Sequence, residues 1–183
     1  MDNGESSYRR FLDGDTGGFD ELVNMYHDAL IYFINGFLFD ITESEDVAED
    51  TFMELIVHPK RFSFRSSLKT YIFQIARNKA IDRVRKRKRI SSTPIDETDI
   101  EDTESIENSV LKDERAKMLH IALGKINEEY ATLLRLVYFE DMTAEEAGRV
   151  LKKNKRQIAN LMYRAKGSLK RAMEEEGFSY EES

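Results

Sequence analysis

The sequence predicts an all-α protein made of two small helical domains joined by a flexible acidic linker. Two observations lead to this prediction. Apolar residues recur at helical spacing through both halves of the chain, and no stretch shows the regular alternation of a half-buried strand. Between the halves, residues 91–108 are rich in Ser, Thr and acidic side chains and poor in apolar ones. We therefore expect domains at residues 1–90 and 109–183, with the linker at residues 91–108.

The first domain should contain three helices. The first of them has a wide apolar face, which is formed by Phe19, Leu22, Tyr26, Leu30, Phe33, Ile34, Phe37 and Leu38. Thr42 and Glu45 have the spacing of a capping box, so a second helix should begin at Glu45. It should end near Val57, because Pro59 follows.

A third helix is expected over residues 68–87. Its inward-facing residues should be Ile72, Ile75, Ala76, Ala80 and Val84. The segment at residues 13–18 is rich in Asp and Gly, and it lacks the later ligand positions of a calcium loop. We therefore expect it to be a flexible lead-in to the first helix.

The second domain should contain four helices. The first two are expected at residues 106–124 and 128–140. Thr143 and Glu146 form a second capping-box pattern, which opens a short helix that ends near Leu151. A polar turn then leads into a last helix at residues 155–175. Two helices joined by a turn of this length, the second of them basic, indicate a helix-turn-helix.

The last helix carries side chains suited to reading duplex DNA. Its apolar residues can pack on the preceding helix, which leaves an outward set formed by Lys155, Arg156, Gln157, Asn160, Tyr163 and Arg164. Arg, Asn and Gln pair with base edges, whereas Lys and Tyr contact phosphates. Arg156, Gln157 and Asn160 are the better candidates for specificity because they lie in the first turns. The alternative is an ordinary helical hairpin with a solvated basic face.

Two further charged segments allow a functional and a structural interpretation. The basic run at residues 83–89 suggests a phosphate-bearing partner, although a solvated helix end would also carry cations. The acidic stripe is formed by Glu45, Asp46, Glu49 and Asp50. It suits a docking surface for a basic protein partner, or plain stabilisation of a helix N-terminus. A carboxylate metal site would need Glu-x-x-His pairs on neighbouring helices, and the sequence has none.

Composition limits the class of protein. The 183 residues include no Cys, and His27, His58 and His120 are scattered, so we expect no metal and no cofactor. Phosphate-binding glycine loops and nucleophile elbows are missing, so we expect no enzyme. No apolar run approaches the roughly 20 residues of a membrane span, and the N-terminus lacks a signal-peptide core. A cytoplasmic protein without membrane insertion is expected.

The net charge of −7 does not argue against a nucleic-acid partner. Residues 91–110 carry seven acidic and no basic side chains, which equals the whole excess. Both halves of the chain are therefore near neutral and have local basic clusters.

Five motifs, taken in order, resemble the extracytoplasmic-function (ECF) sigma factors, a minimal two-domain group of bacterial transcription factors. They are FDELVNMYHDALIYF, EDVAEDTF, SSLKTYIFQIARNKAIDRVRK, INEEYATLLRLVYFEDMTAEEAGRVL and RQIANLMYRAKGSLK. The third is the most specific, and the resemblance extends over about residues 8–172. It implies a factor that binds core RNA polymerase and directs it to promoter DNA.

The resemblance also implies roles for individual residues. The acidic stripe would bind the polymerase, and the outward set of the last helix would read the minus-thirty-five element as duplex. A third group, called the minus-ten set below, would contact the melted minus-ten element: Arg65, Ser66, Ser67, Lys69, Tyr71, Gln74, Arg77, Asn78 and Arg85. An anti-sigma factor is implied as a further partner.

Two alternatives remain open. A free-standing helix-turn-helix regulator, with a sensing or dimerising N-terminal bundle, would explain the second domain equally well. It would leave the acidic stripe and the acidic linker without a purpose. A helical carboxylate metalloenzyme is the third and weakest interpretation.

Overall fold

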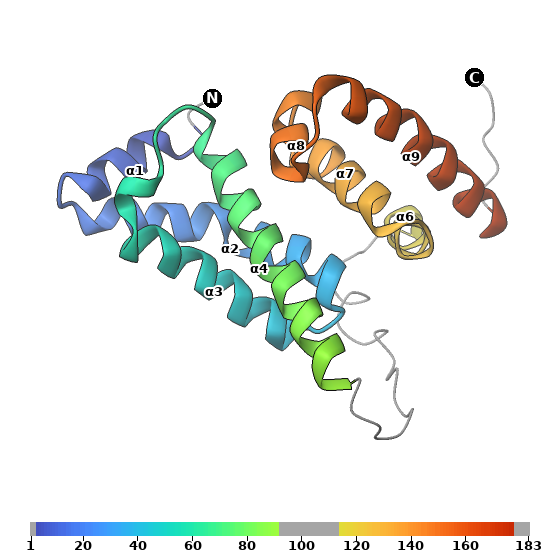
Figure 1. The fold of residues 1–183 in the computed structure, drawn as a ribbon, viewed down its shortest axis with the longest axis horizontal. Helices are drawn as coiled ribbons and strands as arrows, with labels where there is room; N and C mark the ends of the chain where they lie inside the picture. Colours follow the sequence, from blue (N-terminus) through green and yellow to red (C-terminus); the bar gives the residue numbers. More distant parts are fainter. Residues whose placement is uncertain (1–2, 92–113, 178–183) are drawn as a thin grey trace.

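The computed structural model describes residues 3–91 and 114–177, and these residues form helices and loops without a strand (Figure 1). The first helical unit contains α1 (Glu5–Leu12), α2 (Thr16–Leu38), α3 (Ile41–Val57), the 3₁₀ turn η1 (Pro59–Arg61) and α4 (Leu68–Ser91). The second contains α6 (Glu114–Lys125), α7 (Glu128–Tyr138), α8 (Ala144–Leu151) and α9 (Lys155–Glu175). The predicted all-α fold of two helical units is confirmed.

Helix α2 is the central helix of the first unit and packs against α1, α3 and α4. Its predicted apolar face is buried, except that Phe19 is only partly covered. The interior is rich in aromatic rings: Phe33 meets Phe37 and Phe73 edge-on, with ring centroids 5.4 and 5.1 Å apart. Phe73, which was not predicted to face inward, is fully buried on α4, whereas the predicted Ile75 and Val84 are only partly covered.

The segment at residues 13–18 is not the expected flexible lead-in, because Asp15 caps α2 and residues 16–18 form its first turn. An additional helix that was not predicted, α1, precedes it and packs against α2. Tyr8 on α1 is fully buried, and its hydroxyl donates to the carbonyl oxygens of Leu55 and Pro59 at 3.3 and 3.2 Å. Burial, with a smaller contribution from Tyr71, raises the pKa of Tyr8 to about 12. Asp15 caps α2 by accepting a hydrogen bond from the Gly17 amide at 3.0 Å.

Helix α3 begins one turn earlier than predicted. Its N-cap is Asp40, whose carboxylate accepts from the Glu43 amide at 2.9 Å, so Thr42 and Glu45 lie inside the helix and make no capping box. Asp and Thr are both good N-cap residues, and the sequence pattern favoured the wrong one. Helix α4 also extends beyond the predicted residue 87, to Ser91.

The second unit follows the prediction more closely. Helix α8 opens with the predicted capping box of Thr143 and Glu146, and α9 covers residues 155–175 as expected. Helix α7 ends at Tyr138, two residues before the predicted end. The helix predicted from residue 106 is described only from Glu114. Most of the predicted linker lies outside the described residues.

The two units pack against each other. Helix α8 contacts α4, and α7 contacts α2. Leu133, Leu136, Met142, Ala147 and Val150 of the second unit belong to the same buried apolar cluster as the core of the first. In Figure 1 the first unit runs from blue to green, and the second, from yellow to red, lies beside it. No helix among the described residues is long and apolar enough to span a membrane.

Candidate nucleic-acid interface

The helix-turn-helix consists of α8, the turn at residues 152–154 and α9. Lys152 adopts a left-handed conformation with φ 56°, and the Lys153 amide donates to the carbonyl of Gly148 at 2.8 Å. Gly148 permits this close turn, because a Cβ there would lie 3.1 Å from the Lys153 carbonyl oxygen. The turn thus fixes α9 against α8, with Ile158 buried between them.

All six residues of the predicted outward set on α9 are exposed: Lys155, Arg156, Gln157, Asn160, Tyr163 and Arg164. Tyr163 is 83% exposed. Gln157 also completes a second capping box: its side-chain oxygen accepts from the Asn154 amide, and the Asn154 side chain accepts from the Gln157 amide, both at 2.9 Å. Its side-chain NH₂ group keeps both protons for a base edge. A rigid helix start therefore presents these groups to solvent.

The minus-ten set divides between two environments. Tyr71 belongs to the aromatic cluster of the first unit and stacks on Phe62, with centroids 5.1 Å apart. Burial, followed by the nearby charge of Glu54, raises the pKa of the Tyr71 hydroxyl. Arg85 lies farther along α4, where it is exposed and pairs with Asp82 at 3.4 Å. Ser66 and Asn78 are half-buried.

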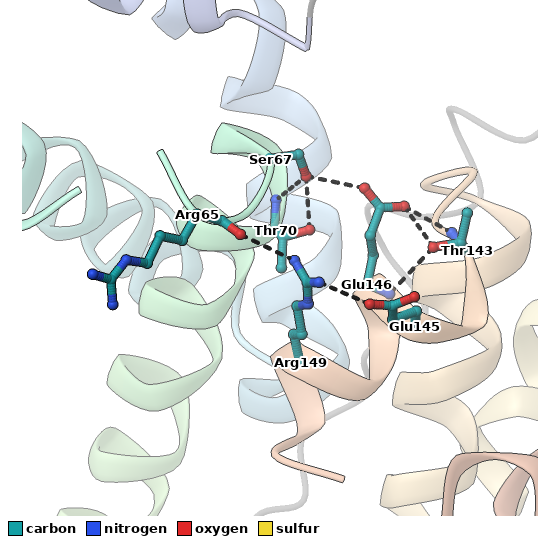
Figure 2. Close-up of polar contacts among 7 residues, drawn as sticks. All are labelled: Arg65, Ser67, Thr70, Thr143, Glu145, Glu146 and Arg149. Carbon is teal, nitrogen blue, oxygen red and sulfur yellow. Dashed lines mark hydrogen bonds and ion pairs between the residues drawn. The ribbon is translucent and has the colours of Figure 1, made fainter. Parts of the chain in front are cut away.

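Members of the minus-ten set near the start of α4 face the second unit. The Ser67 hydroxyl donates to the Glu146 carboxylate at 3.0 Å (Figure 2). The Gln74 side chain donates to the Arg149 carbonyl, and the Arg149 guanidinium donates to the Arg65 carbonyl, each at 3.4 Å. These bonds join the loop at residues 62–67 and α4 to helix α8.

A buried ion pair lies beside them. The ammonium of Lys69 is 3.2 Å from the carboxylate of Glu140 and also donates to the Glu140 backbone carbonyl. The two side chains are only 20% and 8% exposed. Burial raises the pKa of Glu140, and the charge of Lys69 opposes that shift. Each charge compensates the other, because either of them would be costly to bury alone.

Glu146 has the opposite electrostatics. Partial burial raises its pKa, but hydrogen bonds from the Thr143 amide and hydroxyl and from Ser67, together with the charge of Arg149, outweigh that effect. The pKa of Glu146 is therefore held below its usual value, and the group is a carboxylate at neutral pH.

Arg77 completes the side of α4 that faces the second unit. Its Nε is buried without a hydrogen-bond partner in the part of the chain that the structure describes. Burial lowers the pKa of the guanidinium, and the charges of Glu129 and Glu128 on α7 raise it. The two carboxylates compensate the buried charge through space.

The sequence interpretation missed the partners on the second unit. Glu146 was predicted, but only for its capping role, and its contact with Ser67 spans 79 residues of sequence. Nothing marked Glu140 as a partner of Lys69, because a lone Glu after a helix has no pattern of its own.

The acidic stripe on α3 lies on the surface of the protein. Glu45, Asp46, Glu49 and Asp50 are exposed, and no cation among the described residues pairs with them. Met53, Ile56 and Val57 continue the same helix as exposed apolar residues. Exposed apolar side chains beside unpaired charges are typical of a protein-docking surface.

The basic run at the end of α4 has mixed roles. Arg87 pairs with Glu43 at 2.7 Å and with Asp40 at 3.4 Å, and it donates to the Leu38 carbonyl at 2.9 Å. It therefore ties α4 to the start of α3, whereas Arg85, Lys86 and Lys88 are exposed. No group of three or more His, Cys, Asp or Glu side chains in residues 3–91 and 114–177 could hold a metal ion.

Comparisons with known proteins give the following matches. Residues 22–90 match the family Sigma-70 region 2. The chain is 25% identical over 151 residues to the ECF RNA polymerase sigma factor SigW of Bacillus subtilis, which covers 75% of this chain and 79% of that one. It is 26% identical over 171 residues to the RNA polymerase sigma-H factor of Pseudomonas aeruginosa, covering 88% and 89% of the two chains.

Two solved structures share the fold. The sigma factor RpoE of Bartonella quintana, in complex with the anti-sigma factor NepR, aligns with a TM-score of 0.67 and 20% identity over 85% of this chain and 96% of that one. CnrH, in complex with the cytosolic domain of CnrY, also aligns at 0.67, with 19% identity over 95% and 99% of the chains. Both likenesses concern the arrangement of helices.

Proposed function

The chain belongs to the extracytoplasmic-function family of sigma factors, and from this premise we propose that it binds core RNA polymerase and directs it to promoter DNA. The observation that supports this most directly is the Sigma-70 region 2 match over residues 22–90, which contain most of α2, all of α3 and all of α4 except its last residue. It is a cytoplasmic binding factor without catalysis of its own. Membership of this family also provides a partner for the acidic stripe, whereas the alternative of a free-standing helix-turn-helix regulator left the stripe without a purpose.

Three separate surfaces bind the polymerase, the minus-ten element and the minus-thirty-five element. The acidic stripe on α3 binds the largest subunit of the polymerase at its clamp helices. The minus-ten set binds the melted minus-ten element, and pocketing a flipped base there offsets part of the few kcal/mol that unstacking costs. The exposed face of α9 enters the major groove of the minus-thirty-five element, which stays double-stranded. The domain limits at residues 1–90 and 109–183 follow from this division.

The linker between the two domains is long enough to connect two separate DNA sites. About twenty extended residues reach at most about 65 Å, which is roughly one and a half to two turns of duplex. The acidic segment at residues 91–108 would repel DNA and suits the basic nucleic-acid channels of the polymerase. An anti-sigma factor is a further partner, since the two solved relatives are bound to NepR and CnrY.

Capture by core polymerase tests this function. We expect the purified chain to bind core enzyme stoichiometrically at moderate salt, and a variant with Glu45, Asp46, Glu49 and Asp50 changed to Lys to lose binding. A matched control reverses four exposed acids elsewhere: Asp20, Asp28, Glu174 and Glu175. The control should bind as the wild type does. Absence of capture, or equal loss in both variants, would contradict the assignment.

A further inference from the structure

The short helix α1 contacts the segment that leads into α4. The Tyr8 hydroxyl donates to the carbonyl oxygens of Leu55 and Pro59, at 3.3 and 3.2 Å. The Tyr8 ring meets Phe62 edge-on, with centroids 5.9 Å apart. Figure 1 shows this segment beside α1. The family match begins at residue 22, so α1 lies outside the matched residues, and the three surfaces of the proposed function do not include it.

Helix α1 is itself fixed on α2. The Ser7 hydroxyl donates to the Glu21 carboxylate at 2.7 Å, and the Arg10 guanidinium donates to the same carboxylate at 2.8 Å. Gly18 permits close packing, because a Cβ there would lie 2.3 Å from the Ser7 carbonyl oxygen. The position of the neighbouring Arg9 therefore follows from the packing of α1 on α2.

Arg9 contacts the loop at residues 62–67. The central carbon of its guanidinium lies 3.9 Å from the centre of the Phe64 ring, which is a cation–π contact. Arg9 is exposed, and no acidic side chain in the part of the chain that the structure describes pairs with it. The Phe64 ring therefore holds the Arg9 side chain, and Arg9 in turn covers one face of that ring.

Phe64 has an unusual backbone conformation. Its φ is 56°, a left-handed value that is rare for a residue with a bulky side chain. Such a conformation persists only where the surroundings hold it. Two contacts hold the Phe64 ring: the guanidinium of Arg9, and the ring of Phe62, whose centroid is 4.5 Å away. Without Arg9 one of these contacts is lost, and the backbone is freer to return to a negative φ.

The conformation of Phe64 determines the course of the next two residues. Arg65 and Ser66 lie between Phe64 and Ser67, and the Ser67 hydroxyl accepts from the Thr70 amide at 3.2 Å at the start of α4. Because Ser67 is fixed to the helix, the φ of Phe64 decides where Arg65 and Ser66 lie. The Arg65 side chain is exposed, and Figure 2 shows it pointing away from α8.

We infer that α1 positions the loop at residues 62–67 for DNA, and that Arg9 is the positioning residue. Arg9 acts through Phe64: the cation over the ring keeps Phe64 in its left-handed conformation, and this conformation presents Arg65 and Ser66 to a melted strand. The identity of that ligand rests on the proposed function. The hold of Arg9 on the loop rests on the geometry of Arg9 and Phe64 alone.

Nuclear magnetic resonance of the free, full-length chain tests this hold. In Arg9→Gln the ¹⁵N heteronuclear NOE of the loop amides should fall, and the Cα and Cβ chemical shifts of Phe64 should move toward those of a negative φ. Arg171→Gln makes the same substitution at an exposed position of α9 and should leave both quantities unchanged. Wild-type values of both in Arg9→Gln would overturn the inference.

Binding of single-stranded DNA by the holoenzyme tests the consequence. The probe is a fluorescein-labelled 12-mer that the wild-type holoenzyme selects from a random single-stranded pool. Arg9→Gln should bind it about two- to fivefold more weakly, which corresponds to the loss of an exposed cation–π contact. Arg9→Lys keeps a cation for the ring and should lie closer to wild type. Capture of all these variants by core polymerase should stay stoichiometric, which excludes a general loss of folding.

A double-mutant cycle distinguishes positioning from a direct contact with phosphate. If Arg9 acts through Phe64, then Phe64→Leu should weaken binding about as much as Arg9→Gln does, and the double variant should be no worse than either. The slope of log affinity against log salt should stay as in wild type, whereas a lost phosphate contact would make it shallower by about 0.7. Additive losses or a shallower slope would overturn the positioning role. The slope of Arg9→Gln decides alone if Phe64→Leu does not fold.

The same measurements separate this inference from the proposed function. A wild-type chain that core polymerase does not capture, or a pool from which no sequence is enriched, contradicts the sigma-factor function, while the NOE still decides whether Arg9 holds the loop. Capture of Arg9→Gln with wild-type affinity for the probe contradicts the positioning role alone.

Discussion

The carboxylate of Glu146 serves both helical units. One oxygen accepts from the amide and hydroxyl of Thr143, which closes the capping box of α8, and the other accepts from Ser67 on the first unit. The capping role could be predicted from the sequence, because the spacing of Thr143 and Glu146 is sufficient to indicate it. The contact with Ser67 depends on how the whole chain folds, and the local sequence pattern does not contain that information.

Glu146 should therefore make stability depend on pH. Its pKa is lower in the folded protein than its ordinary value of 4.5, so its charged form stabilises the fold above pH 4.5 and this contribution is lost as the pH falls through the lowered value. We expect Glu146→Gln, which can keep the cap, to lower the melting temperature at pH 7. The difference from wild type should shrink as the pH falls below 4.5.

Thermal unfolding followed by circular dichroism measures this difference. Glu175→Gln, at an exposed position with no partner among the described residues, should track the wild type across the whole range. A difference between Glu146→Gln and wild type that stays constant until the protein unfolds in acid would show that the charge has no part in it.

At the scale of elements, the sequence predicted helices well where capping and apolar spacing agreed. Helices α8 and α9 begin and end within a residue of the prediction because each is framed by polar caps. Helix α1 was missed because its mean hydropathy is low and one fully buried residue, Tyr8, holds it. Its stability comes from contacts with α2, α3 and η1, which a local pattern does not contain.

The turn between α8 and α9 contains a removable strain. Lys152 has φ 56°, a region that costs a residue with a Cβ about 1 kcal/mol and costs Gly little. We expect Lys152→Gly to raise the free energy of unfolding by about 0.5–1 kcal/mol, measured by urea denaturation. Lys152→Ala removes the same charge but keeps the Cβ, so it should give no gain. Equal stabilisation by both variants would assign the effect to charge instead.

At the scale of the whole molecule, the packing between units was not predictable. The residues that join the two units lie on the same helices as the residues that fill each local core, and their apolar character is the same. Ala147 and Val150 of α8 lie in one buried cluster with Ile158 of α9 and also with residues of α4, so they serve the helix-turn-helix and the contact between the units at once. The sequence could also place the α9 face on the surface, and the structure agrees for all six residues.

Because the outward set of α9 is exposed, the isolated protein should have weak, salt-dependent affinity for duplex DNA. Lys155→Gln removes one candidate phosphate contact, so the slope of log affinity against log salt should become shallower by about 1. Fluorescence anisotropy with a random 25-base-pair duplex measures it. Lys60→Gln, an exposed lysine on the first unit, is the control and should leave the slope as it is. Equal slopes in all three proteins would place the DNA contact elsewhere.

The contact between α4 and α8 also has a consequence for synthesis on the ribosome. Helices α1–α4 end at Ser91, and they include a core of their own, whereas the covering helix α8 ends sixty residues later at Leu151. Domains fold as units during translation, at about 5–20 residues per second, so roughly 3–12 s pass between these two points. For that interval the nascent chain presents the loop at residues 62–67 and the start of α4 uncovered. A newly made molecule thus exposes, for a few seconds, residues of α4 that α8 contacts in the complete structure.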